Sequence, residues 1–549
     1  MSTFVPIEEL VRFAQGAAIE EARPVLDRVK RLRPGSDERA RMAVPTLAEG
    51  EQYRFHFDMT RCIGCRSCEV ACNEQNNNPP EVNWRRVGEV EGGVYPDTVR
   101  LHISMACNHC LEPSCLEGCP VDAYTKLANG VVDHDADACI GCQYCTWSCP
   151  YGVPQFHAER RVVTKCNLCV DRLGDGQLPA CVNACPTTAI EVEAVDVEGW
   201  RSQIAAANAP GVPPADLTLS TTRITVPADL PESIGSVETQ RLQPEAPHWS
   251  LVWFLTLSQW SVGLFAAAVL FAGDVIASAV MASIAWSLAA LSLASATCHL
   301  GRPIHAWRAV RAWRHSWLSR EVIAFGIYSL VGALPALVAF GGLSARAESG
   351  WLASSTSSTT FAIASGLAAL AGVAGIVSSV GIYRIPARPA WDSGRTPTQF
   401  FATMFLLGAT TTLVVTSSGL AGALGALDDV ARWMLAGVAS VAAIVSALAP
   451  WQLVLAGLDT DESGVRGASI LLTRRFGRLF WSRTVALSVV AAFAPVTVLV
   501  DGASIATICA AGAALLAFAA EIAGRYLFFV AVVPRNTPGG FFTTRAGGH

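Results

Sequence analysis

The segment CIGCQYCTWSCP, residues 139–150, decides how the first half of this chain folds. Its four cysteines are separated by two, two and three residues, and a proline follows the last of them. Three further groups of four cysteines occur before residue 190, and two of those also end in Cys-Pro. This is an internal repeat, which predicts that one supersecondary unit is used several times.

The sixteen cysteines form four groups, numbered here in chain order. Group one repeats the spacing of group three, whereas groups two and four contain wider gaps. Group one is Cys62, Cys65, Cys68 and Cys72; group two is Cys107, Cys110, Cys115 and Cys119; group three is Cys139, Cys142, Cys145 and Cys149; group four is Cys166, Cys169, Cys181 and Cys185.

Three kinds of cysteine site compete for these spacings. A disulfide framework belongs to oxidising compartments, and we expect no export, because residues 1–49 lack a secretory or twin-arginine pattern. A third cysteine two residues after a CxxC pair does not suit a four-ligand zinc site. The ferredoxin run C-x2-C-x2-C-x3-C-P fits group three throughout and group one up to Asn73. We therefore interpret the groups as iron–sulfur ligands, although spacing alone leaves their pairing open.

Three stretches of this half resemble the four-cluster iron–sulfur subunit of the dimethyl sulfoxide reductase family. They are CNHCLEPSCLEGCP (107–120), CIGCQYCTWSCPYGVPQ (139–155) and TKCNLCVDR (164–172). The resemblance covers roughly residues 52–200. It implies a double ferredoxin-like α+β domain that serves a catalytic molybdopterin subunit, with the substrate site on that partner.

The resemblance also implies which cysteines share a cluster. Groups one and four pair in the family, as do groups two and three, and each fourth cysteine crosses to the other cluster of its pair. Related nitrate reductases have tryptophan at the position of Cys142, so this cysteine implies four complete [4Fe–4S] clusters. The implied ligand sets are Cys62, Cys65, Cys68 and Cys185; Cys166, Cys169, Cys181 and Cys72; Cys107, Cys110, Cys115 and Cys149; and Cys139, Cys142, Cys145 and Cys119.

The second half of the chain consists of long apolar runs. Over the whole chain 52% of residues are hydrophobic and only 15% are charged, which is low for a soluble protein. Most of the runs have the 17 to 25 residues that a membrane-spanning helix needs. We expect an all-α membrane bundle with spans at about 249–272, 276–299, 321–342, 358–382, 398–424, 432–457, 484–500 and 503–533, the last two of which could also be drawn differently as one hairpin.

This half resembles the eight-helix quinol-binding anchor of the same reductases, which is usually a separate polypeptide. The matching stretches are CHLGRPIHAW (298–307), SREVIA (319–324), TPTQFFATMFLLGA (396–409) and EIAGRYLFF (521–529). The resemblance implies a quinone or quinol ligand, and we expect it to be bound by His299 and Arg302, with Glu321 as a nearby proton relay.

Two further expectations concern the interior of the bundle. A haem needs axial ligands, commonly histidine, and only His299 falls within the expected spans, so we expect no haem. Glu521 and Arg525 are four residues apart on the last span, which predicts an ion pair between them.

Charge and composition give the expected arrangement of the whole chain. Fifteen arginines fall on the side shared with the N-terminus and two on the other, which predicts an inner-membrane protein whose cluster domain faces the cytoplasm. The net charge of −5 argues against a nucleic-acid partner. The predicted parts are a helical arm (1–49), the cluster domain (50–200), a covering or connecting segment (201–248), the quinone-binding anchor (249–534) and a tail (535–549).

These features favour an electron-transfer and membrane-anchor subunit of a respiratory molybdopterin oxidoreductase. It would pass electrons between the membrane quinone pool and its catalytic partner. The alternative is a membrane-bound ferredoxin-type relay that serves a partner without molybdenum. The genomic or biochemical presence of a molybdopterin subunit would distinguish the two.

Overall fold

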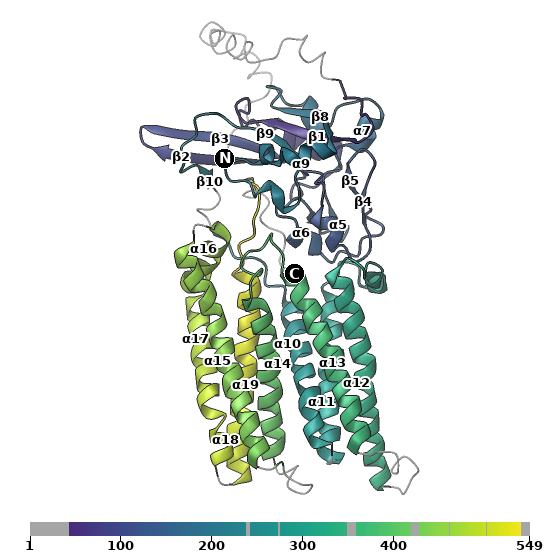
Figure 1. Cartoon of the computed structure of the whole chain (residues 1–549), viewed down its shortest axis with the longest axis vertical. Coiled ribbons are helices and arrows are strands. Elements are labelled where there is room, and N and C mark those ends of the chain that lie inside the picture. Colours follow the sequence, from purple (N-terminus) through teal and green to yellow (C-terminus); the bar gives the residue numbers. More distant parts are fainter. Residues whose placement is uncertain are drawn as a thin grey trace, which may run out of the picture.

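The chain has an α+β part that stands on one end of an eight-helix bundle, as Figure 1 shows. The computed structural model describes residues 43–237, 242–272, 275–347, 358–418, 427, 429–460, 462–500 and 502–539. Most of the expected N-terminal arm (1–49) and most of the expected tail (535–549) lie outside these described residues. The predicted two-part architecture, with iron–sulfur-type cysteine groups first and membrane helices second, is confirmed.

Strand β1 (Glu51–Asp58) is the centre of the first sheet. It pairs antiparallel with β8 (Ile190–Asp196) and parallel with β9 (Arg223–Thr225). Alternate side chains of a strand point to one face, and Phe55 and Phe57 of β1 are buried on the face that covers the cysteine groups. The sheet therefore closes the cluster-bearing core on one side.

The other strands form a second three-stranded sheet and two short hairpins. In the second sheet, β2 (Arg86–Val94) lies between β10 (Gly235–Ser236) and β3 (Asp97–Met105), and all pairs are antiparallel. The hairpins are β4 (Tyr124–Lys126) with β5 (Val132–His134), and β6 (Gln155–His157) with β7 (Val162–Thr164). Short helices connect the strands: α4 (Ser67–Gln75), α5 (Ser114–Gly118), α6 (Tyr144–Ser148), α7 (Val170–Gly174), α8 (Ala180–Asn183), α9 (Val197–Ser202), η1 (Ile204–Ala207) and η2 (Ala215–Leu217).

Residues 201–248 belong partly to the α+β part itself. This segment supplies β9 and β10, one strand for each three-stranded sheet. Its Thr221 hydroxyl donates to the Asn108 carbonyl at 2.6 Å, beside cysteine group two. The segment expected to cover or connect the two halves therefore contributes to the core of the first half, ahead of the bundle.

Eight helices of the described residues are long and apolar enough to cross a membrane, as predicted. Four spans begin earlier than the apolar runs suggest, at Trp317, Arg395, Asp429 and Gly477. Trp317, at the first of these ends, is 40% exposed and suits the interface, while the backbone stays helical. The bundle contains α10 (Trp249–Ala268), η4 (Val269–Phe271), α11 (Val275–Cys298), η5 (Pro303–Val310), α12 (Trp317–Ala347), α13 (Ser358–Tyr383), α14 (Arg395–Ser417), α15 (Asp429–Asp459), α16 (Ser463–Ile470), η7 (Leu471–Arg475), α17 (Gly477–Phe493), α18 (Val496–Leu499) and α19 (Ala503–Val530).

The bundle is built from two groups of four helices. Helices α10 to α13 pack together, and α14, α15, α17 and α19 form the second group, with α10 against α14 between them (Figure 1). Gly263 and Gly408 lie at this central contact, where a Cβ on Gly263 would collide with the Met404 carbonyl oxygen. Small residues let membrane helices approach closely, so these glycines set the distance between the two halves of the bundle.

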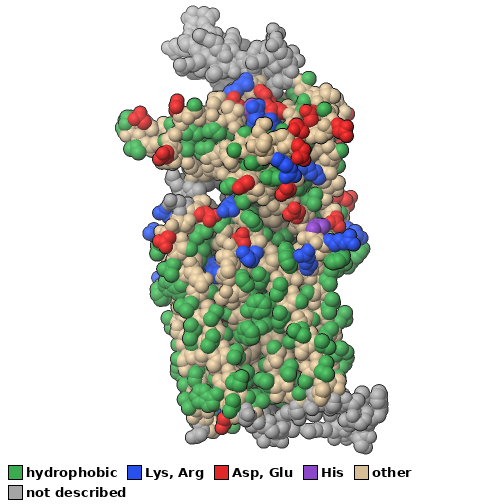
Figure 2. Space-filling view, in the orientation of Figure 1, with side chains coloured by type: hydrophobic (Ala, Val, Ile, Leu, Met, Phe, Trp, Pro, Cys, Tyr) green, Lys and Arg blue, Asp and Glu red, His purple; other side chains and the backbone are tan. Residues whose placement is uncertain are grey.

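Apolar side chains cover the sides of the bundle, and charged side chains gather on the α+β part and at the boundary between the two (Figure 2). Backbone hydrogen bonds join the two parts at this boundary. The Gly301 amide donates to the Gly141 carbonyl at 3.2 Å, and the Arg302 amide donates to the Ile140 carbonyl at 3.0 Å. The turn of cysteine group three is thus fixed to the loop that follows α11.

Candidate functional site

The four cysteine groups share one backbone feature. The residue directly before the second cysteine of each group has a positive φ: Gly64 (68°), His109 (43°), Gly141 (69°) and Leu168 (59°). This left-handed turn brings neighbouring cysteines around a common centre, and glycine adopts it most easily. The four groups therefore share the same backbone turn. The sequence does not reveal it in groups two and four, because His109 and Leu168 occupy the position that glycine occupies in the other two groups.

The fold gathers the cysteines into four sets that cross between groups. Three of these sets line cavities of similar size. Cys107, Cys110, Cys115 and Cys149 line one cavity with about 370 Å³ of empty space. A second cavity of about 300 Å³ is lined by Cys62, Cys65, Cys68 and Cys185, and a third of about 290 Å³ by Cys119, Cys139, Cys142 and Cys145.

The remaining four cysteines also lie together. The pKa of Cys72 is raised above its usual value by burial and then by the nearby thiols of Cys166, Cys181 and Cys169. All eighteen cysteines of the protein are free of disulfide bonds. The structure therefore brings together the same four sets that the family pairing implies, and each offers four thiols to a metal centre.

Buried cations and hydrogen bonds surround these thiols. Arg85 is 1% exposed and donates to the Ser104 hydroxyl at 3.1 Å, and that hydroxyl lies 3.3 Å from the Cys68 sulfur. Lys165 is also buried, and the thiols of Cys107 and Cys115 help to raise its pKa against the effect of burial. Groups of this kind stabilise thiolate ligands and tune the clusters they hold.

Backbone amides also point at the sulfurs. The Ala123 amide donates to the Cys119 sulfur at 3.3 Å, and the Ala189 amide donates to the Cys185 sulfur at 3.2 Å. Burial raises the pKa of the Cys62 and Cys68 thiols to about 11, so neutral thiols are favoured until a metal binds. Donors aimed at sulfur, together with buried cations, fit iron–sulfur cubes better than they fit plain buried thiols.

Neither Arg85 nor Lys165 was singled out from the sequence. Lys165 carried a usable signal, because the chain has only three lysines and this one directly precedes Cys166. Arg85 carried none, because it lies between the groups and reaches them only through the fold of the second sheet.

Cysteine groups two and three both contact the membrane half. The Ser319 hydroxyl of α12 donates to the Pro120 carbonyl at the end of group two at 3.2 Å, whereas group three reaches the core of the bundle. Its helix α6 inserts Tyr144 and Trp147 into the hydrophobic core of the bundle. The Tyr144 hydroxyl donates to the Ile382 carbonyl at 3.0 Å. The Trp147 ring lies 5.0 Å from that of His248 and 6.2 Å from that of His299, centroid to centroid. A cluster-side tryptophan therefore contacts two histidines at the end of the bundle.

His299 lies at the centre of this junction, one residue beyond α11. Its Nδ1 is 3.4 Å from the Ser250 hydroxyl, and its Nε2 has no hydrogen-bond partner of ordinary geometry among the described residues. Burial, and then His248, lowers the pKa of His299 to about 4, although the nearby backbone of Cys142 acts in the opposite direction. The imidazole is therefore neutral at neutral pH, with one nitrogen available to a ligand.

Four residues that the sequence did not identify complete the junction: His248, Arg388, Glu245 and Trp391. The His248 and His299 rings are 5.4 Å apart, and burial followed by Arg388 lowers the pKa of His248 to about 4. Arg388 is buried, pairs with Glu245 at 3.3 Å, and lies over the Trp391 ring at 4.8 Å. His248 precedes the first span and Arg388 lies in a loop, so only tertiary structure brings them to His299.

The structure places Arg302 differently from the expectation. Its guanidinium donates to the Ala136 carbonyl at 2.9 Å and lies 3.5 Å from the Cys139 carbonyl. It therefore binds the backbone that leads into cysteine group three, rather than facing the ring of His299. Its contacts hold the two parts of the molecule together.

Glu321 lies one turn inside α12 instead of at its start. It is buried and accepts a hydrogen bond from the Ser379 hydroxyl on α13. Burial, and then Cys142 and Glu321, raise the pKa of Tyr144 on α6. Glu321 and His299 therefore both lie on the membrane side of cysteine group three. Among the residues that the structure describes, no hydrogen bond joins Glu321 to His299.

The predicted ion pair between Glu521 and Arg525 is wrong. Glu521 accepts from Ser446 at 2.5 Å and pairs with Arg483 at 3.4 Å. Arg525 donates instead to Gln259 at 2.6 Å and to Thr403 at 3.0 Å. Neighbouring helices supply better-placed partners than the next turn of α19 does, which spacing along one helix cannot reveal.

Comparison with known proteins agrees with this geometry. Residues 99–195 match a family model described as a 4Fe-4S dicluster domain, and residues 243–530 match the DMSO reductase anchor subunit (DmsC). One component of the anaerobic dimethyl sulfoxide reductase of Haemophilus influenzae is 40% identical over 177 residues, which cover 31% of this chain and 86% of that protein.

Two other relatives are also 40% identical to this chain, and one of them comes from a differently named complex. The corresponding component of the Escherichia coli anaerobic dimethyl sulfoxide reductase is 40% identical over 153 residues, or 26% of this chain and 75% of that protein. A component of the sulfite dehydrogenase of Allochromatium vinosum is 40% identical over 160 residues, which cover 25% of this chain and 67% of that protein. This multi-pass membrane protein therefore belongs to the dimethyl sulfoxide reductase anchor family, with an iron–sulfur domain homologous to the reductase relatives fused ahead of the anchor.

Proposed function

We propose that this chain carries electrons between the membrane quinone pool and a separate catalytic molybdopterin subunit, through four [4Fe–4S] clusters. The observation that carries the proposal is the contact of Trp147, between two cysteines of group three, with His248 and His299 at the end of the bundle. This contact joins the buried junction around His299 to the cysteine groups within one polypeptide.

The sixteen cysteines would hold the clusters in the four sets that share cavities or lie together. Each bound cluster would carry one electron at a time. The two electrons of a quinol would therefore pass along the clusters one after the other. Arg85 and Lys165 would offset the negative charge of the thiolates in three of these sets. Cys142 completes the set that includes Cys119, so the chain offers sixteen ligands for four cubes.

The quinone site is proposed beside His299. A neutral imidazole with a free Nε2 can donate to, or accept from, a quinone oxygen. His248 and the Trp147 ring would form its walls, and Glu321 would exchange protons nearby through Ser379. Arg302 is proposed as a docking residue for the cluster domain instead of a quinone ligand, and we expect no haem.

The arginine distribution supports a cytoplasmic cluster domain. The described arginine-rich segments 302–320, 384–388 and 466–478 lie at the end of the bundle that carries this domain, and Arg432 lies near the opposite end. Positive residues are retained on the cytoplasmic side. The count from the sequence also included Arg395 and Arg483. Both are buried side chains of α14 and α17, so they are left out of the positive charge at this end of the bundle.

Co-purification of the partner tests this function. A tagged chain isolated anaerobically from its own organism should bring down a molybdenum-containing subunit. The complex should couple quinone analogues to an oxidised or reduced small substrate, and sulfite, S-oxides and N-oxides should be assayed. Isolation with a partner that holds no molybdenum would favour the ferredoxin-type relay and refute the molybdoenzyme assignment.

A further inference from the structure

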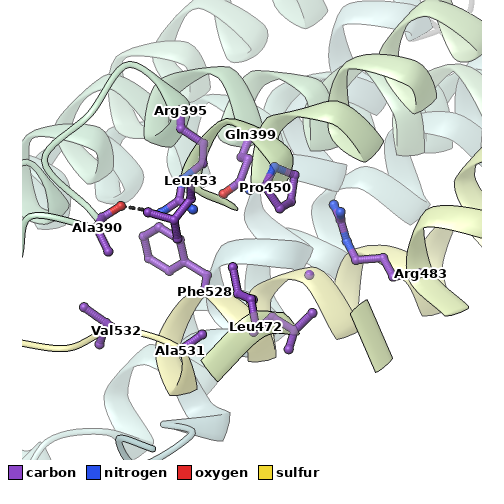
Figure 3. A pocket seen from close by; sticks show the side chains of 12 residues that line it. Ala390, Arg395, Gln399, Pro450, Leu453, Leu472, Arg483, Phe528, Ala531 and Val532 are labelled. Carbon is purple, nitrogen blue, oxygen red and sulfur yellow. Dashed lines mark hydrogen bonds between the residues drawn. The ribbon is translucent and has the colours of Figure 1, made fainter. Parts of the chain in front are cut away.

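A cavity of the membrane half lies in the second group of four helices, and the stacked rings of Trp391 and Phe528 stand between it and Trp147. Helices α14, α15, α17 and α19 surround it at the end nearest the cluster domain (Figure 3). It contains about 360 Å³ of empty space, close to the 370 Å³ of the cavity lined by Cys107 and its set. The two cavities are therefore of similar size.

Two arginines approach this cavity from different helices. In Figure 3 Arg395 extends from α14 over Phe528, and Arg483 reaches in from α17. Arg395 is only 7% exposed, donates to the Ala390 carbonyl, and has a buried Nε without a hydrogen-bond partner. Arg483 is 3% exposed and is fully engaged by Ser446, the Ala520 carbonyl and Glu521.

The charges around the cavity do not balance. None of its described lining residues is acidic, and no carboxylate of the described residues lies within ion-pair distance of Arg395. Two acids near these arginines are already paired: Glu521 with Arg483 at 3.4 Å, and Asp392 with Arg384 at 3.4 Å. A buried cation without a counter-charge is costly, most of all inside a membrane bundle. The cavity therefore favours a negatively charged occupant.

The remaining lining determines the kind of anion. Leu453, Leu472 and Leu527 make the walls apolar, while Gln399 adds an amide beside Arg395. Guanidinium groups bind phosphate-type oxyanions through paired N–H donors. We propose that this cavity is a binding site for a phosphate-type oxyanion, supplied either by the headgroup of an anionic phospholipid or as free phosphate, with Arg395 as the main ligand.

Native mass spectrometry of the intact chain in detergent tests the proposal. The delipidated protein is incubated with phosphatidylglycerol, with phosphatidylcholine or with inorganic phosphate, and retained adducts are weighed. One phosphatidylglycerol or one phosphate should remain bound, and the mass identifies the source. Arg395→Gln should weaken retention by roughly 10- to 100-fold, as expected for loss of a charged hydrogen-bonding ligand. Arg395→Lys should restore part of it.

Two controls separate this effect from general damage. Arg474→Gln removes an exposed charge from η7 at the same end of the bundle and should leave retention unchanged. Leu453→Trp fills the cavity but keeps Arg395, and should also displace the adduct. Iron content and elution volume report whether each variant is folded. Equal retention in wild type, Arg395→Gln and Leu453→Trp, or retention of phosphatidylcholine as strong as that of phosphatidylglycerol, would overturn the proposal.

Discussion

At the scale of single residues, function depends on which polar groups the fold leaves available. Most buried polar atoms at the junction already have partners, as with Arg302 on the Ala136 carbonyl and Glu321 with Ser379. The ring of His299 is neutral, and its Nε2 has no hydrogen-bond partner among the residues that the structure describes. A quinone oxygen needs such a group, so the loss of His299 should affect quinone chemistry more than folding.

Replacing His299 by Ala should reduce quinone-linked turnover of the complex by roughly 10²- to 10⁴-fold, the range for a positioned acid–base group. Iron content and dye-linked activity should remain, because the cysteine sets are untouched. Cys298→Ala changes the adjacent, exposed residue and should have little effect. An unaltered quinone rate in a fully assembled His299→Ala variant would make this histidine a packing residue.

The sequence predicts functional residues that occur in a local motif, such as the cysteine groups. It does not predict residues that only tertiary contacts bring together. The cysteine spacings were sufficient to predict sixteen candidate ligands, and the family pairing agrees with the sets that share cavities. His248 and Arg388 could not be found in this way, because they are far apart in the sequence and meet only at Trp147. The Glu521–Arg525 pair failed for the same reason.

At the scale of elements, the eight membrane helices were predictable because apolar length alone defines them. Their ends were less so, since helices continue past the apolar run into the interface at Trp317 and Gly477. How the helices pack depends on single glycines. Gly263 on α10 and Gly408 on α14 touch at the boundary of the two helix groups, and no side chain fits between them.

Substituting Gly263 by Val should therefore prevent correct assembly of the bundle. The added Cβ would collide with the Met404 carbonyl oxygen, so α10 and α14 must separate. Thermal unfolding and size-exclusion profiles in detergent should show a strong loss of folded protein. Gly437→Val, at a position with open space around it, serves as the control. If both variants behave alike, helix contact at Gly263 is not limiting.

A second glycine contact joins the cluster domain to the bundle. A Cβ on Gly301 would collide with the Arg161 carbonyl oxygen, beside the turn at Gly141. Gly301→Val should lower quinone-linked electron transfer while iron content is kept, because the cysteine sets do not include this loop. Gly394→Val, in open space at the same end of the bundle, is the matched control. Normal coupling in the Gly301→Val protein would show that this contact is dispensable.

At the scale of the whole molecule, one polypeptide unites an iron–sulfur part and a membrane anchor. The reductase relatives match the first part, and the anchor family model matches the second. Fusion fixes the position of cysteine group three over the bundle, through Gly301, Arg302 and Tyr144. Composition predicted both parts, and the arginine bias predicts their orientation. The docking surface itself was not predictable, because its hydrogen bonds are accepted by backbone carbonyls, which carry no sequence signature.

Sidedness can be measured directly. Protease added to intact spheroplasts should leave the cluster domain uncut, whereas inside-out vesicles should lose it, beginning at the exposed β2–β3 hairpin around Tyr95. A periplasmic marker protein and a cytoplasmic one control for membrane integrity. Cleavage in intact spheroplasts would reverse the orientation derived from the arginine bias.

The most direct test of the central claim is electron exchange between a quinol and the clusters of the isolated chain. The protein is purified anaerobically into lipid nanodiscs, its iron is counted, and rapid-freeze paramagnetic resonance follows mixing with a quinol or quinone analogue. About sixteen irons per molecule are expected, four for each cube. A low-potential quinol should reduce the clusters in the wild-type protein, or a quinone should reoxidise the reduced protein, and His299→Ala should slow both. Clusters that dithionite reduces, but that exchange no electrons with either quinone form, would contradict the account.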